Sequence, residues 1–144
     1  MKLYLPDGST PSLDPVASIL NPSRTVAIVG ASSNPLRPSH EIAAYLQRAG
    51  YRIIPVNPNE TEVLGEKCYP RLEDVPEPVD VVDVFRHPEH VPPVADSAIA
   101  VGAKVLWLQL GIENPAAAEK ARAAGLTVVE NACILVEHKK RRPL

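Results

Sequence analysis

A single loop holds the residues of this 144-residue chain that are best suited to bind an anion. It runs from Gly30 to Ser39, directly after the apolar segment 25–29 and directly before a helical pattern. Small residues let main-chain N–H groups approach a phosphate, and the following helix adds its positive end. The hydroxyls of Ser32 and Ser39 and the guanidinium of Arg37 could add contacts. The loop predicts a phosphate-binding turn, although an ordinary serine-rich connection has a similar composition.

The glycine pattern of this loop is incomplete for a dinucleotide-binding fingerprint. Gly30 is the first glycine of a G-x-G-x-x-G pattern, but Ser32 stands where the second would be. Nicotinamide dinucleotide enzymes also place Asp or Glu near the end of the second strand. This chain has Asn57 and Pro58 there, and a neutral amide accepts a ribose phosphate that a carboxylate would repel. An NAD(P)-dependent oxidoreductase with a degenerate fingerprint therefore stays as an alternative.

Two further loops carry residues that would reach the same edge of a sheet. Phe85 could lie along an adenine ring and Arg86 could pair with a phosphate. Alternatively, Phe85 packs in the core and Arg86 is a solvated charge. Gln109 offers an amide for hydrogen bonding, and Gly111 lets the main chain approach a ligand.

No group of residues predicts a catalytic or metal site. His87 and His90 have a helical spacing of three residues, but no third metal ligand is evident. No serine lies in a G-x-S-x-G elbow, and Asp80 and Asp83 fall on opposite faces of a strand. We therefore expect a binding site without catalytic residues.

Five apolar, β-branched segments predict the sheet that positions these loops. They alternate with helical patterns, and their continuous apolar character is typical of parallel strands covered on both faces. With right-handed crossovers they predict a Rossmann-like, doubly wound α/β fold of five mainly parallel strands with helices on both faces. The expected strand order is 3-2-1-4-5, with the site at the carboxyl ends and a switch point between strands one and four. The segments are 25–29, 52–56, 79–85, 104–108 and 126–129.

Helix boundaries are marked by capping residues, prolines and glycines. The clearest helix runs from Asn114 to Ala124, with Asn114 as the N-cap, Pro115 in the first turn and Gly125 after the last. Other helices are expected at 39–49 with Ser39 as the cap, at 88–101, at 131–141 with Asn131 as the cap, near 72–74, and around 15–20 within an N-terminal arm of residues 1–23.

Composition and charge narrow the class of protein. Hydrophobic residues make up 45% of the chain and charged residues 22%, as in a globular domain. A formal net charge of -2 argues against a nucleic-acid or anionic-membrane partner. No apolar stretch is long enough to span a bilayer, and the N-terminus does not resemble a secretion signal. We therefore expect one cytoplasmic domain over residues 1–144, with Cys68 and Cys133 reduced.

The order and spacing of several short motifs resemble those of small stand-alone CoA-binding domain proteins. The motifs are VAIVGAS at 26–32, RPS at 37–39, IPVNP at 54–58, VFR at 84–86 and WLQLG at 107–111. These proteins are similar to the N-terminal CoA-binding domain of the succinyl-CoA synthetase α subunit and to ADP-forming acyl-CoA synthetases. The resemblance implies a Rossmann-like fold that binds coenzyme A or an acyl-CoA, with the first loop at the phosphates and 109–111 beside the pantetheine arm.

The chain departs from the synthetases in two respects. Where they have a lysine after the proline of the second strand, this chain has Glu60, so Arg37 and Arg86 are the expected partners of the CoA 3′-phosphate. Their phosphorylated histidine belongs to a following domain without counterpart here, so we expect a binding protein and not an enzyme. Cys133 matches a family cysteine and is expected to be structural. The expected CoA-binding residues are Gly30, Ala31, Ser32, Arg37, Pro38, Ser39, Val56, Asn57, Pro58, Phe85, Arg86, Gln109, Leu110 and Gly111.

A third hypothesis is a regulatory module that senses CoA and responds by binding a protein partner. The N-terminal arm and the basic run 139–142 could serve such an interaction. Both segments are also typical of solvated tails.

Overall fold

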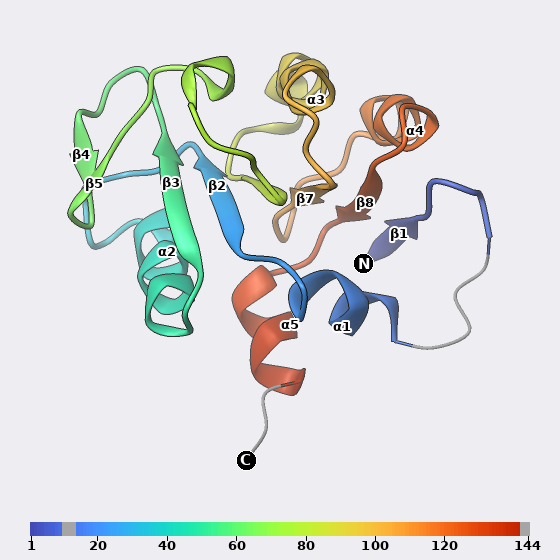
Figure 1. Ribbon diagram of the computed structural model, residues 1–144, viewed down its shortest axis with the longest axis horizontal. Helices are drawn as coiled ribbons and strands as arrows, with labels where there is room; N and C mark the ends of the chain where they lie inside the picture. Colours follow the sequence, from blue (N-terminus) through green and yellow to red (C-terminus); the bar gives the residue numbers. More distant parts are fainter. Residues whose placement is uncertain (10–13, 142–144) are drawn as a thin grey trace.

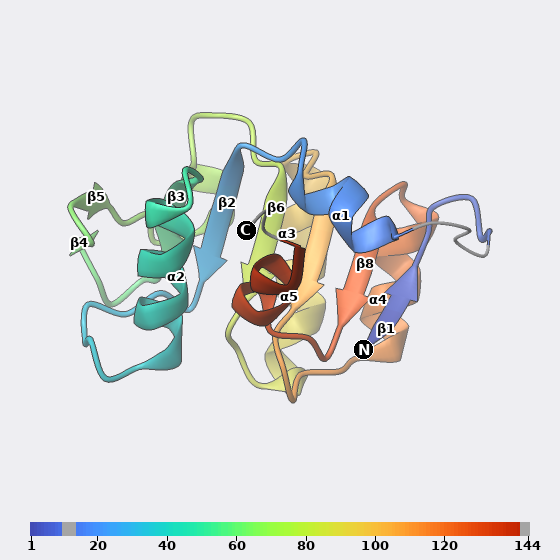
Figure 2. The same ribbon diagram turned by 90° about the horizontal axis from the view of Figure 1, so that it is seen from below.

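A computed structural model describes residues 1–9 and 14–141 and shows a six-stranded sheet with helices on both faces (Figures 1 and 2). Five neighbouring strands are parallel, and the strand at one edge is antiparallel to its neighbour. The α/β class and the five parallel strands are as predicted. From edge to edge the strands are β1 (Lys2–Tyr4), β8 (Thr127–Glu130), β7 (Val105–Leu108), β6 (Val81–Val84), β2 (Thr25–Val29) and β3 (Arg52–Val56).

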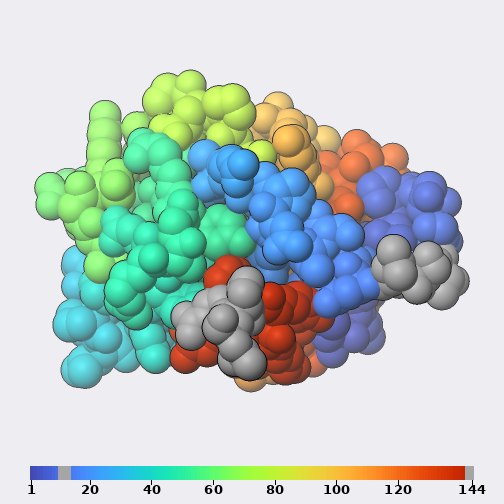
Figure 3. Space-filling model, turned by 60° about the horizontal axis from the view of Figure 1, so that its bottom comes forward, coloured from blue at the N-terminus to red at the C-terminus, as the bar shows by residue number. Residues whose placement is uncertain are grey.

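Two layers of helices cover the sheet. One face carries α1 (Pro15–Leu20), α2 (Pro38–Arg48) and α5 (Ile134–Arg141), which lie side by side in Figure 3. The other face carries α3 (Val91–Ala100), preceded by the 3-10 turn η2 (Pro88–His90), and α4 (Pro115–Ala123) (Figure 2). A small hairpin of β4 (Glu62–Val63) and β5 (Glu66–Lys67) lies beyond β3 (Figure 1).

The order of the parallel strands corrects the prediction. Numbered along the chain it is 2-1-3-4-5 and not 3-2-1-4-5, because β6 lies beside β2 and not beside β3. The reason is the path of the connection 57–80. Its 3-10 turn η1 (Leu72–Asp74) packs on the face of the sheet that α3 and α4 cover. A right-handed crossover on that face carries the chain back across β2. The switch point therefore lies between β2 and β6, strands one and three.

The N-terminal segment forms the sixth strand, which also corrects the predicted count of five. Leu3 lies opposite Val129 in an antiparallel pair, so the main-chain groups along that side of β8 are bonded. Three residues are too few for an alternating pattern to show in the sequence. The predicted short helix in this segment is confirmed as α1.

Of the three predicted N-caps, one is confirmed and two are wrong. Asn114 caps α4 as predicted, because its side chain accepts a main-chain N–H at 3.0 Å. Ser39 is not the cap of α2: the helix begins at Pro38, whose restricted φ suits the first helical position, and Ser39 is buried in the first turn. Asn131 does not cap α5, which starts at Ile134; with φ at 58° it lies in a left-handed turn.

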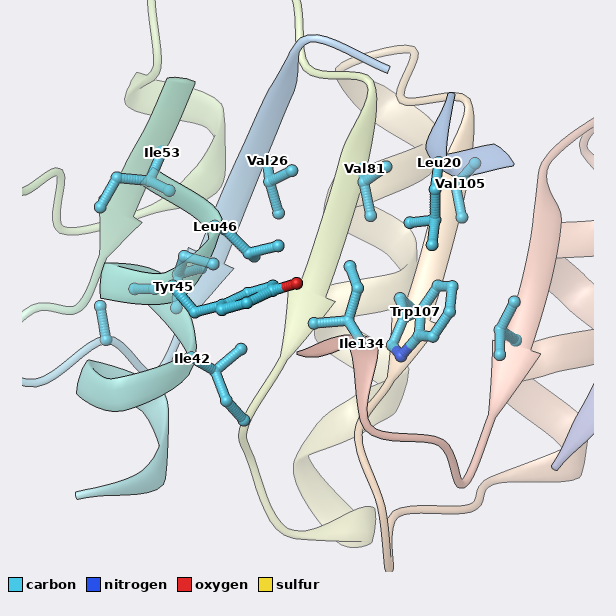
Figure 4. Close-up of a cluster of buried hydrophobic side chains, with 14 of the residues drawn as sticks. Leu20, Val26, Ile42, Tyr45, Leu46, Ile53, Val81, Val105, Trp107 and Ile134 are labelled. Carbon is cyan, nitrogen blue, oxygen red and sulfur yellow. The ribbon is translucent and has the colours of Figure 1, made fainter. Parts of the chain in front are cut away.

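One buried cluster fills the space between the sheet and the layer of α1, α2 and α5 (Figure 4). Trp107 and Ile134 meet there, and the indole Nε1 donates a hydrogen bond to the carbonyl of Ala132 at 2.8 Å.

Asp83 lies in register with Ile28 and Trp107 on this part of the sheet. Its carboxylate is fully buried and has no hydrogen-bond partner among the described residues, and this burial raises the pKa of Asp83 well above its ordinary value.

None of the helices within residues 1–9 and 14–141 is both long and apolar enough to cross a lipid bilayer.

Candidate functional site

A cleft of about 890 Å³ opens at the carboxyl ends of the strands, the edge to which the arrowheads of the parallel strands point in Figure 2. The loops after β2, β3, β6, β7 and β8 form its walls, together with the first turns of α2. It therefore lies at the switch point between β2 and β6, where ligands bind in open α/β sheets. Its volume is in the usual range for a small-molecule site.

The structure brings the predicted site residues together at this cleft, with two exceptions. Ala31 and Val56 do not line it, because their side chains are buried in the core, 1% and 4% exposed. Several further residues that the sequence motifs did not single out also line the cleft. Of these, Asn59, His87, Pro88 and Ile112 directly follow predicted site residues in the same loops, whereas Ile42 and Cys133 depend on folding. The additional lining residues are Ile42, Asn59, His87, Pro88, Ile112 and Cys133.

Gly30 is the point where the loops after β2 and β6 touch. Its φ is 91°, and its N–H donates to the carbonyl of Val56 at 2.9 Å. A Cβ atom at this position would lie 2.9 Å from the carbonyl oxygen of Phe85 and 3.3 Å from Cδ of Arg86. Only glycine fits this close approach, and the Arg86 side chain therefore passes directly over the turn.

The cleft has a basic character. Arg37, Arg86 and His87 line it, and no acidic side chain is among the described residues of its wall. Within residues 1–9 and 14–141, neither guanidinium is in an ion pair, in contrast to Arg52 and Arg141, which are each paired with carboxylates. Both arginines are thus available to an anionic ligand, next to the positive end of α2.

Asn57 ties the loop after β3 to the loop after β2. Its Nδ2 donates to the carbonyl of Ala31 at 2.8 Å, and its Oδ1 accepts the main-chain N–H of Asn59 at 2.9 Å. A second bond joins the same loops, because Glu60 Oε2 accepts the N–H of Ser33 at 2.9 Å. The Asn57 amide, which we expected to favour a ribose phosphate, is thus bonded to protein groups.

The loop after β7 is held in a similar way. Gln109 is 4% exposed, and its Oε1 accepts the N–H of Ile134 at 3.1 Å, so this side chain caps α5. Asn131 accepts the N–H of Gly111 at 2.7 Å and donates to Glu113 at 3.1 Å. Leu110, between Gln109 and Gly111, is 70% exposed at the mouth of the cleft.

Cys133 is half-buried where α5 begins, and it borders both the cleft and the core. Cys68 is buried, and burial raises the pKa of its thiol. Both cysteines are free thiols. The structural role expected for Cys133 stays a prediction. In the described part of the chain no group of three or more His, Cys, Asp or Glu side chains could hold a metal ion.

Comparison with known proteins supplies the family. The family described as "CoA binding domain" matches residues 24–139, which include the whole wall of the cleft. The chain belongs to this CoA-binding domain family. The resemblance drawn from the sequence motifs is thereby confirmed.

Relatives of this CoA-binding domain fall into two groups. YneT of Bacillus subtilis, an uncharacterized protein, is 41% identical over 128 residues that cover 89% of this chain and 95% of YneT. A hypothetical protein from Pyrococcus horikoshii of solved structure is 40% identical with a TM-score of 0.86, covering 92% of this chain and 96% of its own. Acetate–CoA ligase (ADP-forming) II of Archaeoglobus fulgidus is 35% identical over 83 residues, which are 56% of this chain but 12% of the ligase. The ligase therefore resembles the chain over one segment only.

Proposed function

We propose that this domain binds coenzyme A or an acyl-CoA in the cleft and catalyses no reaction of its own. The observation that carries the proposal is that two guanidinium groups, Arg37 and Arg86, lie beside the N-terminus of α2 in one cleft and are not ion-paired with any described residue. Main-chain N–H groups, a helix N-terminus and planar guanidinium groups are the features that bind phosphate anions. Membership of the CoA-binding family supports a CoA ligand in particular.

The arrangement of the walls suggests how such a ligand would lie. The pyrophosphate would lie beside Gly30 and Ser32, within reach of both arginines. The nucleotide would extend toward Asn57 and Pro58, and the pantetheine arm would follow the loop 109–111. Because the Gln109 oxygen is bonded to α5, main-chain groups of this loop would contact the arm more readily than that oxygen.

The proposal of binding without catalysis rests on the groups that line the cleft. Ser32, Ser39, His87 and Cys133 are the lining residues that could act as a base or a nucleophile. None of them is hydrogen-bonded to a histidine or carboxylate side chain among the described residues. We place this function in the cytoplasm, where both cysteines would stay reduced.

Isothermal titration calorimetry of the full chain with CoA and acetyl-CoA tests the proposal. We expect saturable binding at one site, weakened about tenfold by Arg37→Ala, because a charge-assisted contact to phosphate is lost. The matched control is Arg48→Ala, an exposed arginine at the other end of α2, outside the cleft. This substitution should leave the affinity unchanged.

Two further outcomes are informative. No binding heat with either ligand at millimolar concentration would overturn the proposal, and saturable binding of NADH or NADPH alone would favour the oxidoreductase alternative. A pull-down from lysate that depends on added CoA would favour the regulatory alternative over a simple carrier of CoA.

A further inference from the structure

A carboxylate lies beside the otherwise basic cleft, next to two of its lining residues. Glu60 Oε2 accepts the main-chain N–H of Ser33 at 2.9 Å. The neighbours of these two residues, Ser32 and Asn59, both line the cleft. Glu60 is therefore adjacent to a lining residue in the loop after β3, and its partner Ser33 is adjacent to one in the loop after β2. The hydrogen bond between them joins the two loops.

No neighbouring cation neutralises this carboxylate within residues 1–9 and 14–141. Glu66 and Glu77 share Arg52 at 3.3 Å and 2.6 Å, whereas Glu60 is in no ion pair with a described residue. Its hydrogen bond also occupies an N–H of the very loop that would offer such groups to a phosphate. The part of the wall at Ser32 and Asn59 thus has a negative charge beside it, and one main-chain donor of the adjoining loop is occupied.

The positive charges of the cleft and the negative charge of Glu60 lie at the ends of different strands. Arg86 passes over Gly30 at the end of β2, and Arg37 precedes α2, so the cations surround the expected pyrophosphate position. Glu60 lies four residues after the end of the neighbouring strand β3 at Val56. In dinucleotide-binding sheets, a carboxylate after the second strand accepts a hydrogen bond from the ribose 2′-hydroxyl, and an arginine nearby accommodates a 2′-phosphate.

We propose that Glu60 makes this end of the cleft select an adenosine ribose that carries no phosphate. The inference rests on the proposed function and specifies its ligand. A pyrophosphate-linked pantetheine without the 3′-phosphate, such as dephospho-CoA, is bound more tightly than CoA. The physical reason is that the Glu60 carboxylate repels a phosphate on the ribose but accepts a hydrogen bond from a free hydroxyl.

Calorimetric titration of the full chain with CoA and with dephospho-CoA tests this selection. In Glu60→Gln the amide oxygen can still accept the Ser33 N–H, but the charge is gone. We expect this variant to bind CoA about three- to tenfold more tightly, with the affinity for dephospho-CoA changed by less than about twofold. The gain for CoA should shrink as salt is added, since ions screen the repulsion. The control is Glu62→Gln, an exposed carboxylate on β4 that should affect neither ligand.

The outcomes separate this inference from the function on which it rests. If neither ligand binds the unaltered chain, the proposed function is wrong. If both bind but Glu60→Gln changes them equally, or changes neither, the selection by Glu60 is wrong and CoA binding stands. If the unaltered chain binds CoA more tightly than dephospho-CoA, the inference is overturned whether or not the variant folds.

Discussion

The side-chain oxygen of Gln109 accepts a hydrogen bond from the main-chain N–H of Ile134 at 3.1 Å. Gln109 directly follows β7, Ile134 is the first residue of α5, and both are buried. The first N–H groups of a helix have no partner within the helix, so a buried helix start needs an acceptor from elsewhere. A residue at the wall of the cleft thus also holds the helix beside it.

This relationship predicts the effect of Gln109→Ala. The substitution leaves the buried N–H of Ile134 without an acceptor, and we expect the free energy of unfolding to fall by about 1–2 kcal/mol. Urea denaturation followed by circular dichroism measures this change. Leu110→Ala is the control, since that side chain is 70% exposed and should change stability by less than about 0.5 kcal/mol. Equal stability of the two variants would contradict the capping role.

The close approach at Gly30 predicts that alanine is tolerated less well there than at another glycine of similar φ. Gly30→Ala adds a Cβ 2.9 Å from the carbonyl oxygen of Phe85, at a φ of 91°. Gly102→Ala meets no atom within 4 Å at a φ of 73°, so it reports the cost of the backbone conformation alone. We expect a loss of about 1–2 kcal/mol at Gly102 and of about 3 kcal/mol or more at Gly30.

Thermal and urea unfolding of the two alanine variants measure the difference. Gly30→Ala should also weaken CoA binding, because Phe85 or Arg86 must move to make room for the methyl group. Losses of the same size at both glycines would show that the contact with Phe85 is not tight in solution.

The buried Asp83 predicts an unusual dependence of stability on pH. Its pKa is raised well above the ordinary value of 3.8 by burial, so the folded chain keeps the proton that the unfolded chain releases as pH rises through that value. Stability therefore falls with rising pH until the raised pKa is reached. Asp83→Asn removes this effect, and we expect the variant to be more stable than the unaltered chain at pH 7.

Urea unfolding at a series of pH values checks this prediction. The difference in free energy between Asp83→Asn and the unaltered chain should shrink as pH is lowered toward 4, where the unfolded chain also begins to keep the proton. Parallel stability curves over this range would mean that the Asp83 carboxyl has the same pKa folded and unfolded.

The hydrogen bond between Tyr4 of β1 and Glu130 of β8 is expected to stabilise the folded chain. Tyr4 donates to Glu130 Oε1 at 2.6 Å, and this bond raises the pKa of Tyr4 to about 12. Tyr4→Phe leaves one oxygen of a fully buried carboxylate without its donor, so we expect a loss of about 1–2 kcal/mol at pH 7. Tyr69→Phe is the control, because the Tyr69 hydroxyl makes no hydrogen bond to the described residues.

The same bond gives an expectation at alkaline pH. The unfolded chain loses the Tyr4 proton near the ordinary pKa of 10.0, and the folded chain loses it at about 12, so stability falls between these values. Chemical unfolding at pH 9 to 11 should show a steeper loss for the unaltered chain than for Tyr4→Phe. An identical slope would indicate that the hydroxyl does not donate to Glu130.

Much of this fold could be predicted from the sequence, because its elements are set by residues close together along the chain. The segments 25–29 and 52–56 are strands with those bounds, since continuous β-branched residues favour buried parallel strands. Asn114, Pro115 and Gly125 bracket α4 as expected, because capping is a contact between near neighbours. The edge of the sheet at which the cleft opens also followed, since the carboxyl ends of parallel strands meet there.

The tertiary structure alone decided which strands are neighbours and which groups the buried polar side chains bond to. The connection 57–80 has no strong periodicity, so the face on which it crosses the sheet, and with it the strand order, depends on packing. Tyr4 and Glu130 are 126 residues apart, and Gln109 and Ile134 are 25 apart. Local sequence determines where strands and helices form, whereas the partner of a buried polar side chain depends on which distant segments folding brings beside it.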